Sequence, residues 1–354
     1  MSRYHFNESD HPNEQQLRKE TFMTVSPELF VDAVFAYQKT AAIKAAVELD
    51  LFSALAEQDG DVERTARKTG AAPRGIRILC DYLTVQGFLE KRGNAYALTP
   101  SSQTFLVRSS PAYMGTVTDF LASPEMIALW LTDPVSFVRK GGSVGLANVA
   151  NDNPVWIKFA RAMVPFMMPV AGAIASDIAA WPNRPKRVLD VAAGHGMFGI
   201  TLAKAIPGLE VTALDWPGVL TVAQENAAAA GVSERYRTIP GSAFDVDWGN
   251  GYDVVLLTNF LHHFDREACV GLLKRTRAAL RPGGRAVASE FVPNDDRVSP
   301  PLPAMFAYIM LGSTPAGDAY TAAEHQDMGR AAGFARVTTN PVAPTPQTLV
   351  YYET

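Results

Sequence analysis

The spacing of hydrophobic residues changes once along the chain, close to Lys186. Before that point apolar residues recur every three or four positions, as in "SPELFVDAVFAYQKTAAIKAAVELDLFSAL". This pattern predicts an amphipathic helix with Ser26 as its cap and Pro27 in its first turn. After Lys186, short apolar runs alternate with helical stretches. The alternation predicts a Rossmann-like α/β domain, whose doubly wound, mostly parallel sheet binds ligands at the carboxyl ends of its strands.

Seven strands are expected in this second half, with helices in the intervals between them. We place them at Arg187 to Val191, Glu210 to Asp215, Tyr236 to Ile239, Asp253 to Thr258, Arg285 to Phe291, Ala335 to Thr339 and Thr348 to Tyr352.

One stretch of the N-terminal half has the outline of a winged helix. The sequence "DVERTARKTGAAPRGIRILCDYLTVQGFLEKRGNAYALTP" gives a helix, a turn at Gly70, a second helix from Pro73 and two short strands joined by Gly93 and Asn94. The second helix is mainly apolar and the wing mixes acids with bases. These features disfavour DNA contact and favour packing and dimerisation.

The patterns divide the chain into four segments. We expect a flexible leader over residues 1–20, a mainly α-helical winged-helix dimerisation domain over 21–106, a helical linker and substrate-covering region over 107–180, and a ligand-binding α/β domain over 181–354. The polar leader lacks the apolar core of a signal peptide. The stretch "KGGSVGLANVANDNP" is expected to be a surface loop.

Composition narrows the class of protein. A chain of 354 residues is long enough for two domains, and 47% hydrophobic with 19% charged residues is typical of a soluble globular protein. A net charge of −4 gives no basic balance for nucleic acid or an anionic membrane, and no apolar run reaches the length of a membrane span. Cys80 and Cys269 form no C-x-x-C pair, which favours a reducing cytoplasm.

The stretch "VLDVAAGHGMFG" places Gly194, Gly196 and Gly199 in a G-x-G-x-x-G pattern between a strand and a helix. Such a turn commonly holds the pyrophosphate of NAD or FAD. Asp190, four residues before the first glycine, would repel two phosphate charges but would favour the cationic S-adenosylmethionine. Asp215, at the end of the second strand, is placed to accept hydrogen bonds from a ribose diol.

Several motifs together carry a resemblance to a known family. They are "VLDVAAGHG", "ALDWPGV", "GSAF", "LHHFDREACVGLLKRTRAALRPGGRAVASEFVP" and "GDAYTAAEHQDMGRAAGF". The chain resembles the class I S-adenosylmethionine-dependent methyltransferases of the small-molecule O-methyltransferase family, which includes plant caffeate-type and bacterial polyketide-tailoring enzymes. The resemblance covers about nine tenths of the chain and implies a homodimer formed through the N-terminal domain.

The resemblance also implies a set of cofactor contacts. Asp190, Gly194 and Gly196 would line the methionine end of S-adenosylmethionine, Asp215 would hold the ribose, and Trp216 would cover the adenine. Where the family commonly has an acid, an apolar residue and Phe against the adenine, this chain has Ser242, Ala243 and Phe244. The missing acid leaves adenine recognition to the Ser242 hydroxyl or to backbone groups, and Asp245 or Asp247 could replace the acid only if the loop shifts.

The catalytic chemistry is expected in "NFLHHFD", after the fourth strand. By resemblance His262 is the general base, and a histidine exchanges protons near neutral pH. Its neighbour is His263, at a position where plant relatives often have Asp. Glu290 matches the acid that orients the base, and Asp318 is one residue away from the position of a second such acid.

Apolar residues are expected to shape a pocket for a small, planar acceptor. Aromatic and methionine side chains suit such a pocket. The candidates are Trp156, Phe159, Met163, Phe166, Met167, Phe291, Met305, Phe306 and Met310.

No metal-ligand set is apparent, so metal-independent catalysis is expected. Two alternatives remain open: an S- or C-methyltransferase or other tailoring enzyme on the same fold, and a cofactor-sensing winged-helix regulator of DNA.

Overall fold

The computed structural model describes residues 25–144 and 154–354. The predicted leader, and most of the predicted surface loop, lie outside the described residues. The chain forms two compact units, the first ending at Ser102 and the second beginning at Gln103. Each unit is described by itself below.

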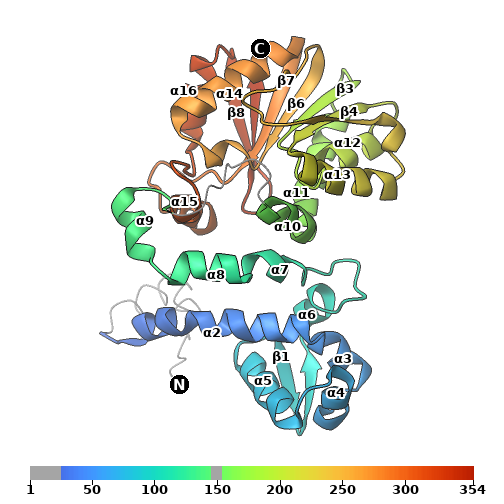
Figure 1. Cartoon of the computed structure of the whole chain (residues 1–354), viewed down its shortest axis with the longest axis vertical. Helices are drawn as coiled ribbons and strands as arrows, with labels where there is room; N and C mark the ends of the chain where they lie inside the picture. Colours follow the sequence, from blue (N-terminus) through green and yellow to red (C-terminus); the bar gives the residue numbers. More distant parts are fainter. Residues whose placement is uncertain (1–24, 145–153) are drawn as a thin grey trace, which may run out of the picture. The chain divides into compact units, whose positions relative to one another are not determined.

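The first unit contains the predicted winged helix (Figure 1). Gly70 ends the first helix of this motif in the left-handed conformation, with φ 67°. The wing strands pair antiparallel, with Leu89 opposite Leu98. The elements are α2 (Glu28–Glu48), α3 (Leu51–Glu57), α4 (Val62–Thr69), α5 (Pro73–Val85), β1 (Leu89–Arg92) and β2 (Ala95–Leu98).

The prediction of one long amphipathic helix from Ser26 is wrong, because the structure has two helices there. The chain breaks between α2 and α3, where Asp50 adopts a left-handed φ of 50° and its carboxylate accepts a 2.7 Å hydrogen bond from the Ser53 hydroxyl. Periodicity alone does not reveal this break, because apolar spacing continues on both sides of it.

The second unit contains the predicted seven-stranded sheet, with strand order β5-β4-β3-β6-β7-β9-β8. Neighbouring strands are parallel except β9, which is antiparallel to both β7 and β8. The mostly parallel α/β prediction is confirmed. The strands are β3 (Arg187–Val191), β4 (Glu210–Asp215), β5 (Tyr236–Pro240), β6 (Tyr252–Thr258), β7 (Leu280–Glu290), β8 (Arg336–Pro341) and β9 (Thr348–Glu353).

One strand differs clearly from its predicted bounds. β7 begins at Leu280, five residues before the predicted start, because Leu280 pairs with Tyr252 ahead of a register irregularity. The proline and two glycines in "LRPGG" hide this part of the strand from a sequence pattern. Phe291 follows the strand and does not belong to it.

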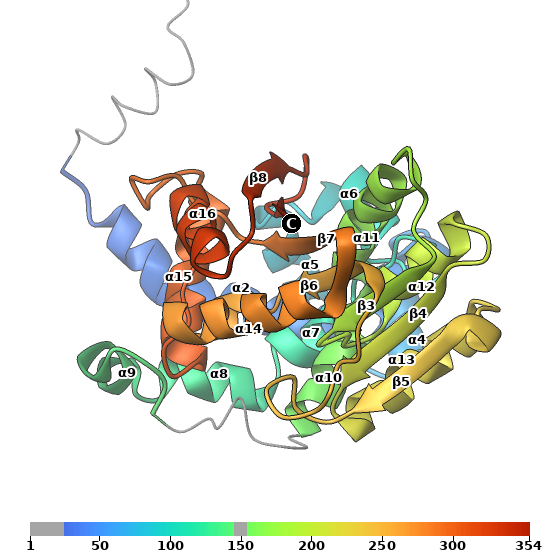
Figure 2. The same ribbon diagram turned by 90° about the horizontal axis from the view of Figure 1, so that it is seen from above.

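Helices cover both faces of the sheet and form two core layers (Figure 2). On one face α11, α12 and α13 pack over Val188, Val254 and Leu256. On the other, α14 and α16 pack over Leu189 and Val255. The alternation of side chains along each strand makes this division.

The helices of this unit are α7 (Val117–Leu121), α8 (Pro124–Leu131), α9 (Pro134–Lys140), α10 (Pro154–Ala162), α11 (Val164–Ala179), α12 (Met197–Ala205), α13 (Pro217–Ala229), α14 (Arg266–Ala279), α15 (Pro301–Ser313) and α16 (Ala322–Ala331), with the 3₁₀ turns η1 (Ser233–Arg235) and η2 (Leu261–His263).

A short helix, α6 (Pro100–Phe105), lies at the junction of the two units. Among the described residues no single helix is long and apolar enough to cross a membrane. The bent pair α10 and α11 reaches that length only when the two are taken together.

Candidate active site

The glycine turn joins β3 to α12 at the carboxyl edge of the sheet. Gly194 and Gly196 both have left-handed backbones, with φ 57° and 74°. A Cβ atom on Gly196 would lie 2.5 Å from the Tyr236 hydroxyl and 2.9 Å from the Cβ of Ala223. The turn therefore needs glycine at this position for both conformation and space.

Two carboxylates support this turn from inside. Oδ2 of Asp190 accepts a 3.1 Å hydrogen bond from the Gly199 N–H, and burial raises the pKa of Asp190 to about 8. Asp215 accepts hydrogen bonds from the N–H groups of Gly194 at 2.8 Å and Trp216 at 2.7 Å, and burial raises its pKa to about 6. Both predicted acids are thus held beside the turn.

Burial opposes the negative charge predicted for Asp190. The side chain is completely buried, and the loss of solvation favours its neutral carboxyl form, which raises its pKa to about 8. Its Oδ1 atom is buried and has no hydrogen-bond partner among the described residues. A cationic group nearby would favour the ionised form, which fits a sulfonium donor better than a diphosphate.

This raised pKa predicts a pH dependence of stability. Between about pH 4 and about pH 8 the unfolded chain has an ionised Asp190 while the folded chain keeps it protonated, so its contribution to stability falls as pH rises. We expect Asp190→Asn to lose less unfolding free energy than the parent between about pH 5 and about pH 8 in urea titrations without ligand. Replacing the exposed Asp245 by Asn is the matched control, and equal pH slopes for parent and Asp190→Asn would contradict the prediction.

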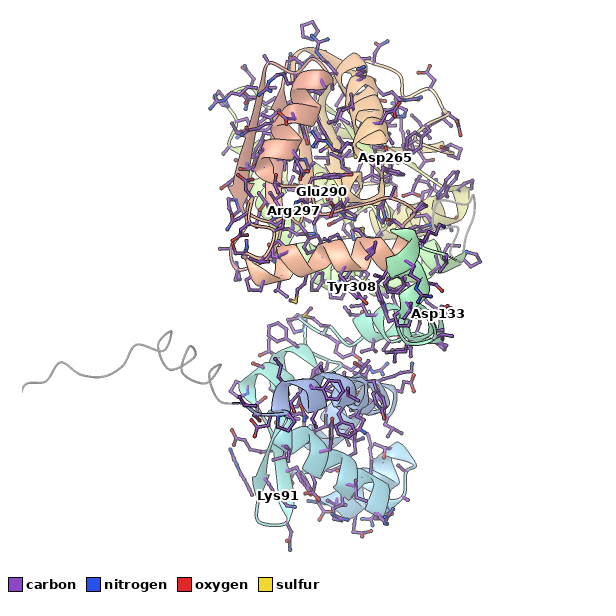
Figure 3. All side chains as sticks on the ribbon, turned by 90° about the vertical axis from the view of Figure 1, so that its left-hand side faces the viewer. Lys91, Asp133, Asp265, Glu290, Arg297 and Tyr308 are labelled. Carbon is purple, nitrogen blue, oxygen red and sulfur yellow. The ribbon has the colours of Figure 1, made fainter. Side chains whose placement is uncertain are left out.

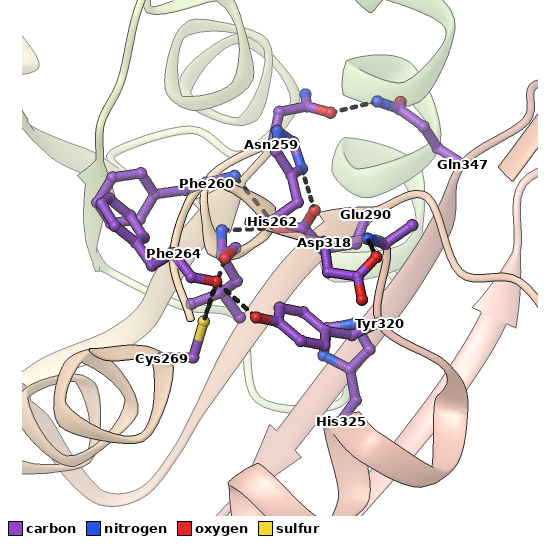
Figure 4. A network of polar contacts seen from close by, with 12 residues as sticks. Asn259, Phe260, His262, Phe264, Cys269, Glu290, Asp318, Tyr320, His325 and Gln347 are labelled. Carbon is purple, nitrogen blue, oxygen red and sulfur yellow. Dashed lines mark hydrogen bonds and ion pairs between the residues drawn. The ribbon is translucent and has the colours of Figure 1, made fainter. Parts of the chain in front are cut away.

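The second centre is the turn after β6. The Nδ1 atom of His262 pairs with Oε2 of Glu290, the last residue of β7 (Figure 4). The other oxygen, Oε1, accepts hydrogen bonds from the N–H groups of Phe260 at 3.1 Å and Leu261 at 2.9 Å. One buried carboxylate therefore holds both the imidazole and the backbone of its turn, and Nε2 of His262 is left to act on another molecule.

His263 lies beside this pair and is partly buried. Its ring is 4.4 Å from that of His262 and meets the Trp156 ring edge to face at 5.6 Å. Burial and the neighbouring His262 lower its pKa well below the usual value, and the Asn259 backbone opposes this shift only in part. His263 is therefore a neutral group that packs under the turn.

Asp318 does not reach the His262 imidazole, so the second orienting acid is not where it was predicted. Its backbone N–H donates to the His262 carbonyl at 3.0 Å. Its carboxylate accepts from the Ala319 N–H at 2.8 Å and from Arg297 at 3.3 Å, and the side chain is 40% exposed. Arg297 and Glu290 are both labelled in Figure 3. The carboxylate is held by Arg297, while the backbone of Asp318 supports the turn.

Two aromatic rings from separate elements meet at His262. Phe291 and Phe306 are stacked with ring centroids 3.8 Å apart, and Phe306 meets the His262 ring edge to face at 4.8 Å. The other residues predicted to line the acceptor pocket do not gather around His262. Phe159, Met163, Phe166 and Met167 pack into the core layer below α11, Met310 is buried, and Met305 is 56% exposed.

The residues predicted to contact the adenine have different surroundings. The Ser242 hydroxyl accepts a 3.1 Å hydrogen bond from the Phe244 N–H, and Phe244 is 40% exposed, with its ring edge on Phe264. Ala243 is buried in the core. Trp216 packs beside the cluster of Ala160, Val219 and Val222. Within the described part of the chain, no group of three or more His, Cys, Asp or Glu residues could hold a metal ion.

The sheet order, the glycine turn and the buried histidine–carboxylate pair define an S-adenosylmethionine-dependent methyltransferase. Comparisons with known proteins agree. An O-methyltransferase domain model matches residues 144–335, and an O-methyltransferase dimerisation domain model matches residues 31–108. The chain belongs to this O-methyltransferase family, and its enzymes methylate small molecules.

Individual relatives support the same assignment. The chain is 44% identical to a Nostoc punctiforme protein classed with the O-methyltransferases; the crystal structure matches with a TM-score of 0.89, covering 94% of this chain and 100% of the other. It is 30% identical to 3-hydroxy-5-methyl-1-naphthoate 3-O-methyltransferase of Streptomyces sahachiroi over 88% of this chain and 91% of that enzyme. It is 29% identical to the tetracenomycin 8-O-methyltransferase TcmO of Streptomyces glaucescens, over 89% and 93%.

Proposed function

We propose that this enzyme methylates a hydroxyl group on a planar, aromatic acceptor, with His262 as the general base. The observation that carries the proposal is the buried pairing of His262 Nδ1 with Glu290. Because Glu290 occupies Nδ1, Nε2 keeps the lone pair that accepts the acceptor's proton.

The protein's part in the reaction is to orient the acceptor and to move one proton. When bound, S-adenosylmethionine would supply the methyl group, and its sulfur would leave as a neutral thioether. His262 Nε2 takes the hydroxyl proton, so the acceptor oxygen gains the electron density needed to attack the methyl carbon. Glu290 stabilises the resulting imidazolium. The stacked Phe291 and Phe306 rings offer a flat apolar surface beside this base.

For the cofactor we propose the turn at Gly194 and Gly196, with Asp190 toward the sulfonium end and Asp215 toward the ribose. Both carboxylates lie at this turn. Trp216, Ser242, Ala243 and Phe244 remain candidates for the adenine side, and we propose that no metal takes part.

We also propose a homodimer built through the N-terminal unit. The match to a dimerisation domain and the exposed apolar residues of α2, including Leu29 at 74% and Phe30 at 73%, support it. The compartment proposed is a reducing cytoplasm, since Cys80 and Cys269 are both buried and unpaired.

Calorimetry and an acceptor panel test this function. We expect S-adenosylhomocysteine to bind and NAD to show no heat of binding. With S-adenosylmethionine, aromatic hydroxyl compounds should accept the methyl group faster than thiols of the same ring size. Transfer only to thiols or to carbon would overturn the assignment of oxygen, and binding of NAD alone would overturn the cofactor.

A further inference from the structure

Asn259 connects four parts of the second unit at the turn that carries His262. Its N–H donates to the Ser289 carbonyl at 2.8 Å. Its side-chain oxygen accepts a hydrogen bond from Nε2 of Gln347 (Figure 4). Its Nδ2 lies 3.4 Å from the Met167 sulfur. Asn259 thereby joins the catalytic turn to β7, to α11 and to the residue that precedes β9.

The backbone of Asn259 is itself unusual. Its φ of 52° lies in the left-handed region, which asparagine tolerates better than most residues other than glycine. It follows β6 directly and precedes His262 by three residues. The direction in which the chain leaves the strand, and so the position of the imidazole, depends on this conformation.

The amide pair spans the end of the strand that bears Glu290. In the sheet, β7 lies between β6 and β9. Thr258 pairs with Ser289 on one side of β7, and Thr348 pairs with Glu290 on the other. Asn259 and Gln347 are the next residues beyond Thr258 and before Thr348, so their hydrogen bond bridges the carboxyl end of β7.

The two partners of the Asn259 side chain are buried. Gln347 is 2% exposed and Met167 is 5% exposed. A second contact of Gln347 Nε2, 3.9 Å from the same Met167 sulfur, holds the amide in one orientation. A thioether is only a weak acceptor, so the amide–amide hydrogen bond is the strong interaction of this group.

We propose that Asn259 and Gln347 form a positioning pair for the His262–Glu290 couple, distinct from the residues that touch the acceptor. This inference rests on the proposed role of His262. The pair fixes the backbone turn between β6 and η2, which aims Nε2 of His262 at the acceptor hydroxyl. A misplacement of about 1 Å at such a group can cost about 10²-fold in rate.

Two variants separate the effect of the amide–amide hydrogen bond from the effect of the left-handed backbone at Asn259. Gln347→Met removes the donor and keeps an unbranched apolar side chain against Met167. Asn259→Gly removes the amide and keeps the left-handed backbone. Each is expected to lower kcat about 10–100-fold, with the acceptor KM and the Kd of S-adenosylhomocysteine within about twofold of the parent. The kcat of the double variant should be no lower than that of the less active single variant, since both substitutions break the same hydrogen bond.

A measurement without turnover accompanies the kinetics. In ¹⁵N-histidine-labelled protein, the Nδ1–H signal of His262, assigned by its loss in His262→Gln, should shift or broaden in both single variants. It should be unchanged in Gln224→Met, which alters an exposed glutamine on α13.

The outcomes separate this inference from the proposed function. An unchanged His262 signal and an unchanged kcat in both variants overturn the positioning pair alone. A raised acceptor KM with parental kcat also overturns it, because these residues would then contact the acceptor. If the parent transfers no methyl group to oxygen, the proposed function fails, and the His262 signal still decides whether the pair positions the imidazole.

Discussion

Replacing His262 by alanine should lower kcat for an aromatic hydroxyl acceptor by about 10²- to 10⁴-fold, the usual contribution of a positioned general base. The reason is chemical, because a neutral hydroxyl is a poor nucleophile until its proton leaves. S-adenosylhomocysteine should bind to the variant as it does to the parent, because the glycine turn follows a different strand, β3. Steady-state kinetics and calorimetry measure the two quantities.

A thiol acceptor supplies the control for this experiment. A thiol ionises more readily than most hydroxyl groups, so its methylation depends less on a base. His262→Ala should therefore affect thiol transfer far less than hydroxyl transfer in the same preparation. Equal losses for both acceptors would show that His262 shapes the site without serving as the base. His263→Asn tests the neighbour, which we expect to matter less because its ring packs edge to face with Trp156.

The fold was predictable because the strands are marked by their own composition. β3, β4 and β6 are short, mainly apolar runs with the sequences RVLDV, EVTALD and YDVVLLT, and a strand buried on both faces requires such a run. The break at Asp50 and the early start of β7 were not predictable. Both depend on contacts made after folding: a left-handed cap in one case and pairing with Tyr252 in the other.

The candidate site was predictable to different degrees for its different parts. His262 and Glu290 are 28 residues apart in sequence. The spacing of apolar residues does not reveal that they pair, but the resemblance to the family does. Asp318 shows the limit of such transfer. Asp318 is one residue away from the family position of the second acid, and its carboxylate pairs with Arg297 instead of His262. Arg297 lies in the loop after β7 and has a left-handed φ of 56°.

Asn259 was overlooked although it lies inside the motif "NFLHHFD". An asparagine directly after a buried strand is a signal for a left-handed residue, and this signal could have been used. Its partner Gln347 could not have been found in the same way. The two residues are 88 positions apart, and only the strand order brings them together.

Glu290 is expected to show the second large effect, and its two oxygens allow catalysis to be separated from folding. In Glu290→Gln one oxygen can still accept the N–H groups of Phe260 and Leu261, so the thermal unfolding midpoint should stay close to that of the parent. The new amide NH₂ would donate to Nδ1 of His262. This forces the tautomer that carries its proton on Nε2, which cannot act as a base. We expect kcat to fall about 10²- to 10⁴-fold, because an amide in place of the orienting carboxylate has this effect in histidine-based enzymes.

Glu290→Ala should differ from Glu290→Gln in stability rather than in activity. It leaves two buried N–H groups without an acceptor, and each such loss costs about 1–3 kcal/mol. The alanine variant is therefore expected to unfold at clearly lower temperature and urea concentration, with kcat at least as low as in Glu290→Gln. Full activity in Glu290→Gln would contradict the orienting role, and equal stability of the two variants would contradict the backbone role. Since the first result depends on the Oε2 contact and the second on the Oε1 contacts, each role of this carboxylate can fail without the other.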